Sequence, residues 1–137
     1  ILDHFAAMTR VHAVLAPYMR ALVAEGAETG LPLQRALFLH YPANHDYTCC
    51  CQDQFLLGTD LMVAPVIEQG ATSRQVLLPA EDSWIHVWSG EVFSGGTHLV
   101  HAPLGSPPVF ARHASPYAAV FAALAQARGP IAEGTAK

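Results

Sequence analysis

The aspartates and glutamates are the first candidates for chemistry, because paired carboxyl groups can act as acid and base in bond cleavage. Asp53 and Asp60 flank a short apolar segment and a glycine, where they could bind a ligand. Aspartates at helix ends and turns far more often accept hydrogen bonds from nearby amides, so we do not expect this pair to be catalytic. The other loop and turn acids are interpreted as solvated surface charges: Asp46, Glu68, Glu81, Asp82 and Glu91.

Eight histidines raise the alternative of a metal site. His40 and His45 bracket a loop, whereas His98 and His101 lie three residues apart on a predicted strand. Residues at an odd spacing on a strand point to opposite faces, so His98 and His101 are not expected to chelate one ion. A zinc site usually needs three or four ligands, and the sequence offers no convincing set, so we predict no metal site.

All three cysteines are consecutive, at Cys49, Cys50 and Cys51. Disulfide geometry requires Cα atoms about 4.4–6.8 Å apart with particular dihedral angles, which neighbouring cysteines seldom reach. The cysteines also lack the spacing of a zinc or redox motif. We interpret them as free thiols in a loop, which fits a reducing compartment and predicts a cytoplasmic location.

Trp84 and Trp88 could hold a ligand, because aromatic rings can stack on sugar rings. Their even spacing places both on one face of a predicted strand, where aromatic residues are more often part of the core. The sequence contains neither a glycine-rich phosphate loop before a helix nor a Gly-x-Ser-x-Gly nucleophile elbow. These residues therefore predict no catalytic group and no cofactor site.

The composition limits the partners of this 137-residue chain. Hydrophobic residues make up 52% and charged residues only 13%, whereas free globular domains carry about 25% charged residues. This shortage predicts that much of the surface faces other protein, in a longer chain or in an oligomer, and the oligomeric state stays open. A net charge of −4 and scattered basic residues disfavour nucleic acid. The apolar stretches are shorter than the roughly 18–20 residues of a membrane helix.

The elements that would position these residues begin with a helix over 2–29, because apolar residues recur at helical spacing until Gly30 and Pro32 end the pattern. Pro17 lies inside this helix and predicts a kink. The apolar run 35–41 predicts a strand buried on both faces, as in a parallel sheet or barrel. A short helix is predicted at 52–57. The face of the long helix predicted to be buried comprises Phe5, Met8, Leu15, Tyr18, Leu22 and Val23.

After Gly70 the pattern changes to short β-type segments about every ten residues, separated by turns, which predicts a small antiparallel β-sandwich. A final helix is predicted from Ser115, whose side chain can cap it. The fold class is therefore α/β plus all-β, with an α/β end over 1–58, a sandwich over 59–114, and a terminal helix and tail over 115–137. The predicted strands cover 74–79, 84–88, 91–93, 98–102 and 109–112.

Several strings resemble glycoside hydrolase family 31. The first spans Leu31–Val66 and reads LPLQRALFLHYP, a loop, and DQFLLGTDLMVAPV. It is similar to the end of the catalytic barrel in this family of retaining α-glucosidases and α-xylosidases. The later strings EQGATSRQVLLP, SWIHVWSGEVFSGG and APLG are similar to the β-sandwich that follows the barrel. The resemblance implies that 1–58 is the C-terminal end of a TIM (β/α)8 barrel.

One branch of the family looks closer than the others. The strings Leu104–Arg112, Ser115–Tyr117 and Trp84–Trp88 resemble those of sulfoquinovosidases, which release sulfoquinovose from its α-glycosides. The resemblance implies a C-terminal fragment, inactive alone, of a retaining exo-acting α-glycosidase whose two catalytic carboxylates lie on earlier barrel strands. No catalytic, cofactor-binding or metal residue is therefore placed in this chain, and the carbohydrate substrate would bind through the missing barrel. The alternatives are a general α-glucosidase or α-xylosidase, and a non-catalytic structural or carbohydrate-binding module.

Overall fold

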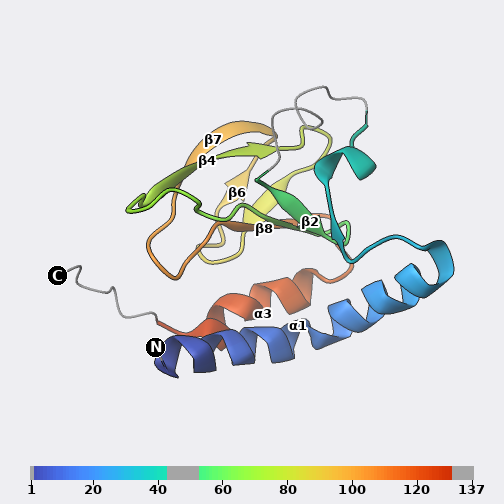
Figure 1. The fold of residues 1–137 in the computed structure, drawn as a ribbon, viewed down its shortest axis with the longest axis horizontal. Coiled ribbons are helices and arrows are strands. Elements are labelled where there is room, and N and C mark those ends of the chain that lie inside the picture. The colour runs from blue at the N-terminus through green and yellow to red at the C-terminus, as the bar shows by residue number, and fades with distance from the viewer. Residues whose placement is uncertain (1, 43–52, 131–137) are drawn as a thin grey trace.

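The computed structural model describes residues 2–42 and 53–130. Figure 1 shows three layers: a two-stranded sheet, a larger sheet beneath it, and two helices against the other face of the larger sheet. This arrangement confirms the predicted small antiparallel β-domain, with two helices packed against it. The elements in chain order are α1 (Leu2–Thr29), β1 (Gln34–Arg35), the 3-10 helix η1 (Leu37–Leu39), β2 (Phe55–Leu57), β3 (Leu61–Val63), β4 (Ser73–Leu78), β5 (Trp84–His86), β6 (Val92–Phe93), β7 (Gly96–His101), β8 (Val109–Arg112) and α3 (Ala118–Arg128).

The larger sheet has the order β1-β2-β3-β8-β5-β6, and β4 pairs with β7 in the smaller one. Every strand pair is antiparallel, with Met62 opposite Phe110 and Leu61 opposite Ala111. Successive side chains on a strand point to opposite faces. Met62 and Phe110 therefore pack toward the smaller sheet, while Leu61 and Ala111 pack toward the helices, and the larger sheet is buried on both faces.

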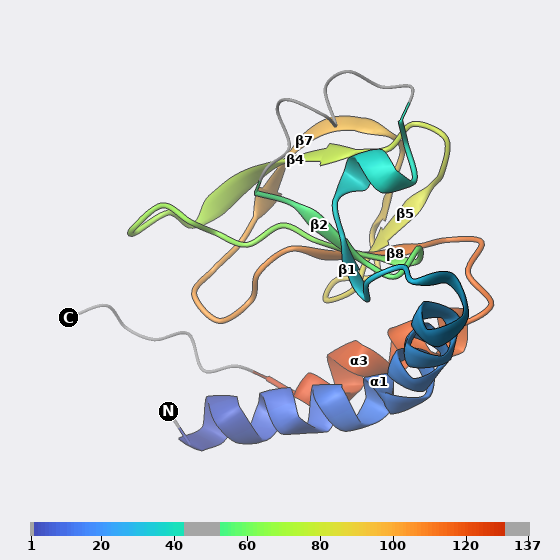
Figure 2. The ribbon, with the colours of Figure 1, turned by 45° about the vertical axis from the view of Figure 1, so that its right-hand side comes forward.

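Two hydrophobic cores hold the layers together, and burying each large side chain contributes about 1.5–3 kcal/mol relative to exposing it. Figure 2 shows α1 and α3 side by side beneath the larger sheet. Tyr18 of α1 packs edge-on against Phe121 of α3, with ring centroids 5.0 Å apart. The core between the sheets comprises Leu37, Leu56, Met62, Ala64, Val76, Leu78, Trp84, Val100 and Phe110. The core between the larger sheet and the helices comprises Tyr18, Leu22, Leu61, Val87, Ala111, Phe121 and Leu124.

Helix α1 has the predicted bounds, and Gly30 donates its amide to the carbonyl of Gly26 at its end. The predicted buried face is wrong in part, because Phe5 is 71% and Val23 57% exposed. These two residues are separated by 18 positions, or five turns of 3.6 residues, so they lie on the same side of the helix. Tyr18 and Leu22 occupy the side that meets the sheet. Helix α1 therefore carries apolar side chains on two sides, and the described residues cover only one of these sides.

Two local predictions before residue 58 are wrong. The strand expected at 35–41 exists only as Gln34–Arg35, and η1 follows because Leu39 and His40 donate their amides to carbonyls three residues back. The helix expected at 52–57 is instead β2, which finds antiparallel partners in β1 and β3. The described residues contain no parallel strand pair and no barrel. The division at residue 58 stays a prediction, although the β2–β3 hairpin crosses it.

The second half follows the predicted pattern closely. Strands β4 to β8 lie within the predicted segments or within two residues of them. Helix α3 begins at Ala118, later than predicted, although Ser115 Oγ accepts the amide of Tyr117 at 3.0 Å. Within the described residues, neither helix combines the length and the apolar character needed to cross a lipid bilayer.

Candidate functional site

Asp60 lies in the turn between β2 and β3, and it is only 3% exposed. Its Oδ1 accepts hydrogen bonds from Nε of Arg112 at 2.7 Å, and Nη2 of Arg112 lies 2.6 Å from the same oxygen. Its Oδ2 accepts the hydroxyl of Ser115 at 2.8 Å. Both carboxylate oxygens are therefore occupied by donors of this chain, and Asp60 joins the hairpin to β8 and to the segment before α3.

Tyr18 connects α1 to the same turn. Its hydroxyl donates to the carbonyl of Leu57 at 2.7 Å and accepts the amide of Asp60 at 3.1 Å. Burial raises the pKa of Tyr18 to about 12. Gly58, between these two partners, has φ +66°, and a Cβ there would lie 2.3 Å from Tyr18 Oη and 2.4 Å from Cδ2 of Leu22. The turn can approach the helix this closely because residue 58 has no side chain.

Asp82 is not the solvated surface charge that was expected. Its Oδ2 accepts the hydroxyl of Tyr41 at 3.0 Å, and its Oδ1 lies 3.9 Å from Nη1 of Arg112. Burial and the hydrogen bond to Asp82 raise the pKa of Tyr41. Arg112 thus lies between Asp60 and Asp82, and this network holds parts of the chain that are far apart in sequence.

Asp53 has a different partner from Asp60. Its Oδ2 lies 2.5 Å from Nη2 of Arg74 on β4, and the two side chains are 38% and 10% exposed respectively. Asp53 therefore pairs with a residue of the smaller sheet, whereas Asp60 pairs with a residue of β8. Each carboxylate of this candidate pair is neutralised separately by an arginine, an arrangement that holds the fold together.

His40 and His98 have separate hydrogen-bond partners. His98 Nε2 lies 2.8 Å from the carbonyl oxygen of Ser94, while His101 is exposed on the other face of β7. His40 Nε2 lies 3.1 Å from Nη1 of Arg35, and burial, followed by the charge of Arg35, lowers the pKa of His40. Groups of three potential metal ligands are absent from residues 2–42 and 53–130. Asp46, His45 and Cys49–Cys51 lie outside the described residues.

His86 is a buried histidine whose role the sequence did not indicate. Its Nδ1 lies 2.8 Å from Ser89 Oγ, and its ring packs 5.2 Å from that of Phe110. Burial lowers its pKa. This environment favours the neutral imidazole and fits a packing role.

The two tryptophans have different surroundings. Trp84 is fully buried and donates Nε1–H to the carbonyl of Pro79, so it belongs to the core. Trp88 donates to the carbonyl of Pro107, and the guanidinium of Arg128 lies 4.3 Å from the centre of its ring. Intramolecular contacts therefore occupy both rings, and neither forms an open platform for a sugar.

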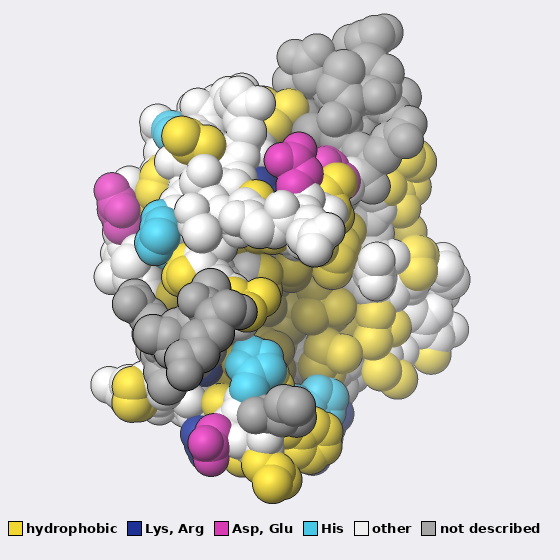
Figure 3. Space-filling view, turned by 60° about the vertical axis from the view of Figure 1, so that its left-hand side comes forward, with side chains coloured by type: hydrophobic (Ala, Val, Ile, Leu, Met, Phe, Trp, Pro, Cys, Tyr) yellow, Lys and Arg dark blue, Asp and Glu magenta, His cyan; other side chains and the backbone are white. Residues whose placement is uncertain are grey.

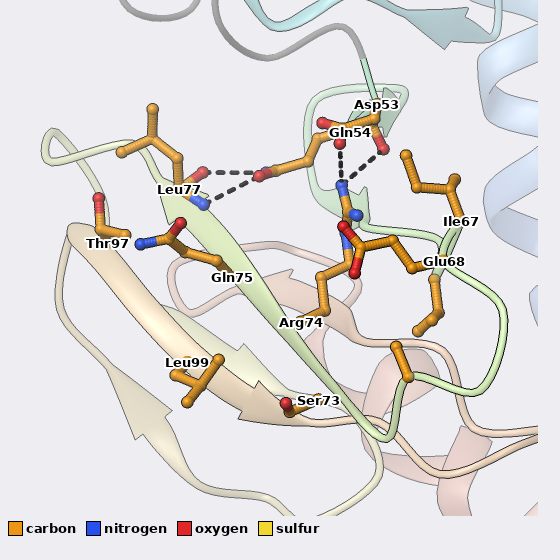
Figure 4. Close-up of a pocket in the computed structure, with 12 residues that line it drawn as sticks. Asp53, Gln54, Ile67, Glu68, Ser73, Arg74, Gln75, Leu77, Thr97 and Leu99 are labelled. Atoms are coloured by element: carbon orange, nitrogen blue, oxygen red, sulfur yellow. Dashed lines mark hydrogen bonds and ion pairs between the residues drawn. The ribbon is translucent and has the colours of Figure 1, made fainter.

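A hollow of about 550 Å³ lies over the outer face of β4 and β7. Figure 4 shows its floor formed by side chains of the two strands, with Asp53 and Gln54 on one side and Ile67 and Glu68 on another. Gln54 supports that wall by pairing with the backbone of Leu77, donating to its carbonyl at 3.0 Å and accepting its amide at 2.9 Å. Polar and aliphatic side chains together line this hollow.

This hollow was not predicted from the sequence, although the alternation of exposed and buried residues along β4 indicates part of its floor. Ser73, Gln75 and Leu77 point to one face, and Val76 and Leu78 to the other. A polar strand face is normally assigned to solvent. The walls come from segments that only the tertiary fold places beside that face.

Figure 3 shows a face with few charged side chains and with hydrophobic side chains gathered in its centre. Several large apolar residues are also exposed outside the hollow. They are Leu2, Phe5, Val23, Phe38, Leu39, Val92 and Leu104. Exposed apolar residues on α1 and η1 indicate surfaces suited to contact with more protein.

Residues 30–115 match the family described as "Glycosyl hydrolase family 31 C-terminal domain". The chain is 51% identical to the sulfoquinovosidase of Escherichia coli (strain K12) over 88% of this chain and 18% of that protein. It is 37% identical to alpha-glucosidase 2 of Bacillus thermoamyloliquefaciens over 72% of this chain and 12% of that protein. This chain therefore spans less than a fifth of the length of either relative.

The fold is also similar to that of a family 31 sulfoquinovosidase from E. rectale, solved in complex with an aza-sugar inhibitor. The TM-score is 0.85 at 39% sequence identity, covering 90% of this chain and 18% of that one. The match in fold and the match in sequence thus cover similar shares of this chain, 90% and 88%.

Proposed function

This chain belongs to glycoside hydrolase family 31, and from that premise we propose that it is the C-terminal part of a retaining, exo-acting α-glycosidase, most specifically a sulfoquinovosidase. The observation that carries the proposal is the 51% identity to a sulfoquinovosidase over 88% of the chain, against 37% to an α-glucosidase over 72%. The branch-like strings at Trp84–Trp88 and Leu104–Arg112 support the same choice. The alternative within the family is a general α-glucosidase or α-xylosidase.

The proposed reaction is a double displacement at the anomeric carbon. One carboxylate attacks that carbon and forms a glycosyl-enzyme, while a carboxylic acid protonates the departing oxygen; the same group then removes a proton from the attacking water. The bond to the aglycone breaks in the first step, and the bond to the enzyme breaks in the second. The net change is hydrolysis with retention of configuration.

The described carboxylates support placing these two groups elsewhere in the longer protein. Asp60 has both oxygens engaged by Arg112 and Ser115, and Asp82 is held by Tyr41 and Arg112. Asp53 is paired with Arg74. A nucleophile needs an accessible carboxylate positioned against substrate, and these side chains are committed to the fold. We propose a supporting role for this chain and assign it no catalytic residue.

The exposed apolar residues fit that supporting role. Phe5 and Val23 lie on the side of α1 away from the sheet, and Phe38 on η1 is 44% exposed. We propose that the rest of the enzyme, which would contain the barrel, covers these residues. We infer this partner because more than four-fifths of each relative's length has no counterpart in this chain.

Hydrolysis by the full-length protein tests the proposed activity. We expect release of nitrophenol from 4-nitrophenyl α-sulfoquinovoside and at least 100-fold lower kcat/KM on the α-glucoside, because a site built for the sulfonate leaves its charged groups unpaired when that substituent is missing. Product configuration, followed by NMR at early times, should show retention. The reverse substrate preference would replace the first proposal by the α-glucosidase alternative, and inactivity on all α-glycosides would reject both.

A further inference from the structure

We propose that His86 is an acid-sensitive switch at the edge of the larger sheet: protonation of its ring releases β6 and the turn before it from β5. The inference goes beyond the proposed function and does not depend on it, because every group it uses lies in this chain. Strand β6 is the last strand of the larger sheet, and within the described part of the chain it pairs only with β5.

The ring of His86 is enclosed between two strands. The residue is 9% exposed, and it shares with Trp84 the face of β5 that points toward the smaller sheet. Its ring centre lies 5.2 Å from that of Phe110 on β8 and 6.5 Å from that of Phe93 on β6. A positive charge on this ring would be taken out of water and placed among apolar side chains, which disfavours the charged form.

The hydrogen bonds of His86 suit a ring with one proton only. Its Nδ1 lies 2.8 Å from Ser89 Oγ, which also accepts the amide of Glu91 at 3.3 Å. Its Nε2 is buried and has no hydrogen-bond partner in residues 2–42 and 53–130. The imidazolium carries an N–H on both nitrogens, so protonation leaves a buried, charged donor unpaired at Nε2.

The surrounding charges do not offset this cost. Burial lowers the pKa of His86, opposed by the negative charge of Glu91 and assisted by the positive charge of Arg128 on α3. Glu91 is exposed, so water screens its attraction. His98 on β7 faces the same cluster from the far side of Phe93, with ring centres 5.2 Å apart, and its protonation would add another positive charge.

Opening the edge gives the ring access to water at the loss of few contacts. The amide of His86 donates to the carbonyl of Glu91, and the amide of Gly90 donates to the carbonyl of His86, both at 2.8 Å. Strand β6 itself has only two residues. Short edge elements with few contacts are the parts of a fold that open locally.

The direction of the pH dependence follows from the lowered pKa. In the open edge His86 meets water and ionises near its ordinary pKa of 6.5, whereas the closed edge takes up the proton only at lower pH. The open form therefore binds the proton first. Closure is fully favoured well above pH 6.5 and weakens as the pH falls below it.

The test is amide hydrogen exchange of the full-length enzyme, followed by mass spectrometry at pH 7.5 and pH 5.5, with labelling times scaled for the intrinsic exchange rate. We expect peptides spanning 84–93 to lose protection about ten-fold at pH 5.5, as a pKa difference of about one unit gives. Peptides from β3 and α3 should keep theirs.

Two variants assign the effect to His86. His86→Asn keeps a group that can pair with Ser89 but cannot become positive, so its protection over 84–93 should be the same at both pH values. His101→Asn is the matched control, because His101 is exposed on the outer face of β7, and it should lose protection in acid as the unchanged enzyme does. If His86→Asn is already open at pH 7.5, His86→Gln serves as the second neutral variant.

Three results would overturn the proposal. The first is equal protection of 84–93 in the unchanged enzyme at both pH values, as expected if contact with the Phe110 ring stabilised the cation. The second is an acid-induced loss that persists in the neutral variants, which would assign it to another group. The third is an equal loss in β3 and α3, which would mean that acid unfolds the whole domain rather than its edge.

Discussion

Arg112 binds a single carboxylate oxygen of Asp60 through two nitrogens, with Nε at 2.7 Å and Nη2 at 2.6 Å from Oδ1. The two residues are 52 positions apart in the chain. The backbone follows the same pairing, because the amide of Arg112 donates to the carbonyl of Asp60 at 2.8 Å. This contact joins the β2–β3 hairpin to β8, and the stability of the domain should depend on it.

Replacement of Asp60 by asparagine should lower the free energy of unfolding by about 2–4 kcal/mol, because it removes one charge of a largely buried pair. The amide keeps the size of the side chain, so the loss measures the charge and its hydrogen bonds. Urea unfolding of the chain at micromolar concentration gives the difference. Glu91→Gln changes an exposed acid and should shift stability by less than about 0.5 kcal/mol. Equal effects of both changes would show that the Arg112 contact contributes nothing specific.

Gly58→Ala should destabilise the chain by about 3 kcal/mol or more, since a Cβ would overlap Tyr18 and Leu22 in addition to straining a left-handed backbone. Gly90→Ala is the matched control, because its φ is +76° and a Cβ there would meet nothing within 4 Å. That change should cost about 1–2 kcal/mol, the backbone strain alone. Thermal or urea unfolding of both variants separates overlap from strain, and equal losses would contradict the close contact with α1.

Tyr18→Phe should change how stability depends on alkaline pH. The unfolded tyrosine ionises near its ordinary pKa of 10.0, whereas burial raises the folded pKa to about 12, so the unfolded state loses its proton first. The contribution of Tyr18 is therefore complete below pH 10 and is lost as the pH rises toward 12. The phenylalanine variant lacks this contribution, while Tyr41 keeps its own raised pKa in both proteins.

The measurement is urea unfolding of both proteins from pH 8 to pH 11. We expect Tyr18→Phe to be about 1–3 kcal/mol less stable at pH 8, where Leu57 and Asp60 lose a hydrogen-bond partner. The gap should narrow above pH 10. A constant gap across this range would mean that Tyr18 ionises as easily in the fold as in water.

Without the rest of the enzyme, the exposed apolar side of α1 is expected to make the isolated chain self-associate, and Phe5→Gln combined with Val23→Gln should reduce this self-association. Both side chains are mostly exposed on one side of α1, so their replacement removes apolar surface without opening the core. Sedimentation velocity at several concentrations measures the change, and the unfolding free energy should shift by less than about 0.5 kcal/mol. Leu104→Gln alters a residue that is 91% exposed in a loop and should leave self-association unchanged. If the loop variant were equally effective, the outer side of α1 would have no special role.

The sequence alone determined the elements whose pattern is local. The bounds of α1 follow from helical periodicity and its glycine–proline end, and β4 to β8 follow from short alternating segments between turns. The strings around Leu31–Val66 also indicated family 31, in agreement with the match over residues 30–115. These features need no knowledge of distant contacts.

The tertiary structure decided what depends on distant partners. Phe55–Leu57 is a strand because β1 and β3 lie beside it, and Asp60 is buried because Arg112 and Ser115 reach it from more than 50 residues away. The hollow likewise exists because Asp53 and Glu68 are placed against the outer face of β4 and β7. Local residue patterns specify helices and alternating strands, whereas hydrogen-bond pairing and burial between remote segments determine which short apolar runs become strands and which charges become structural.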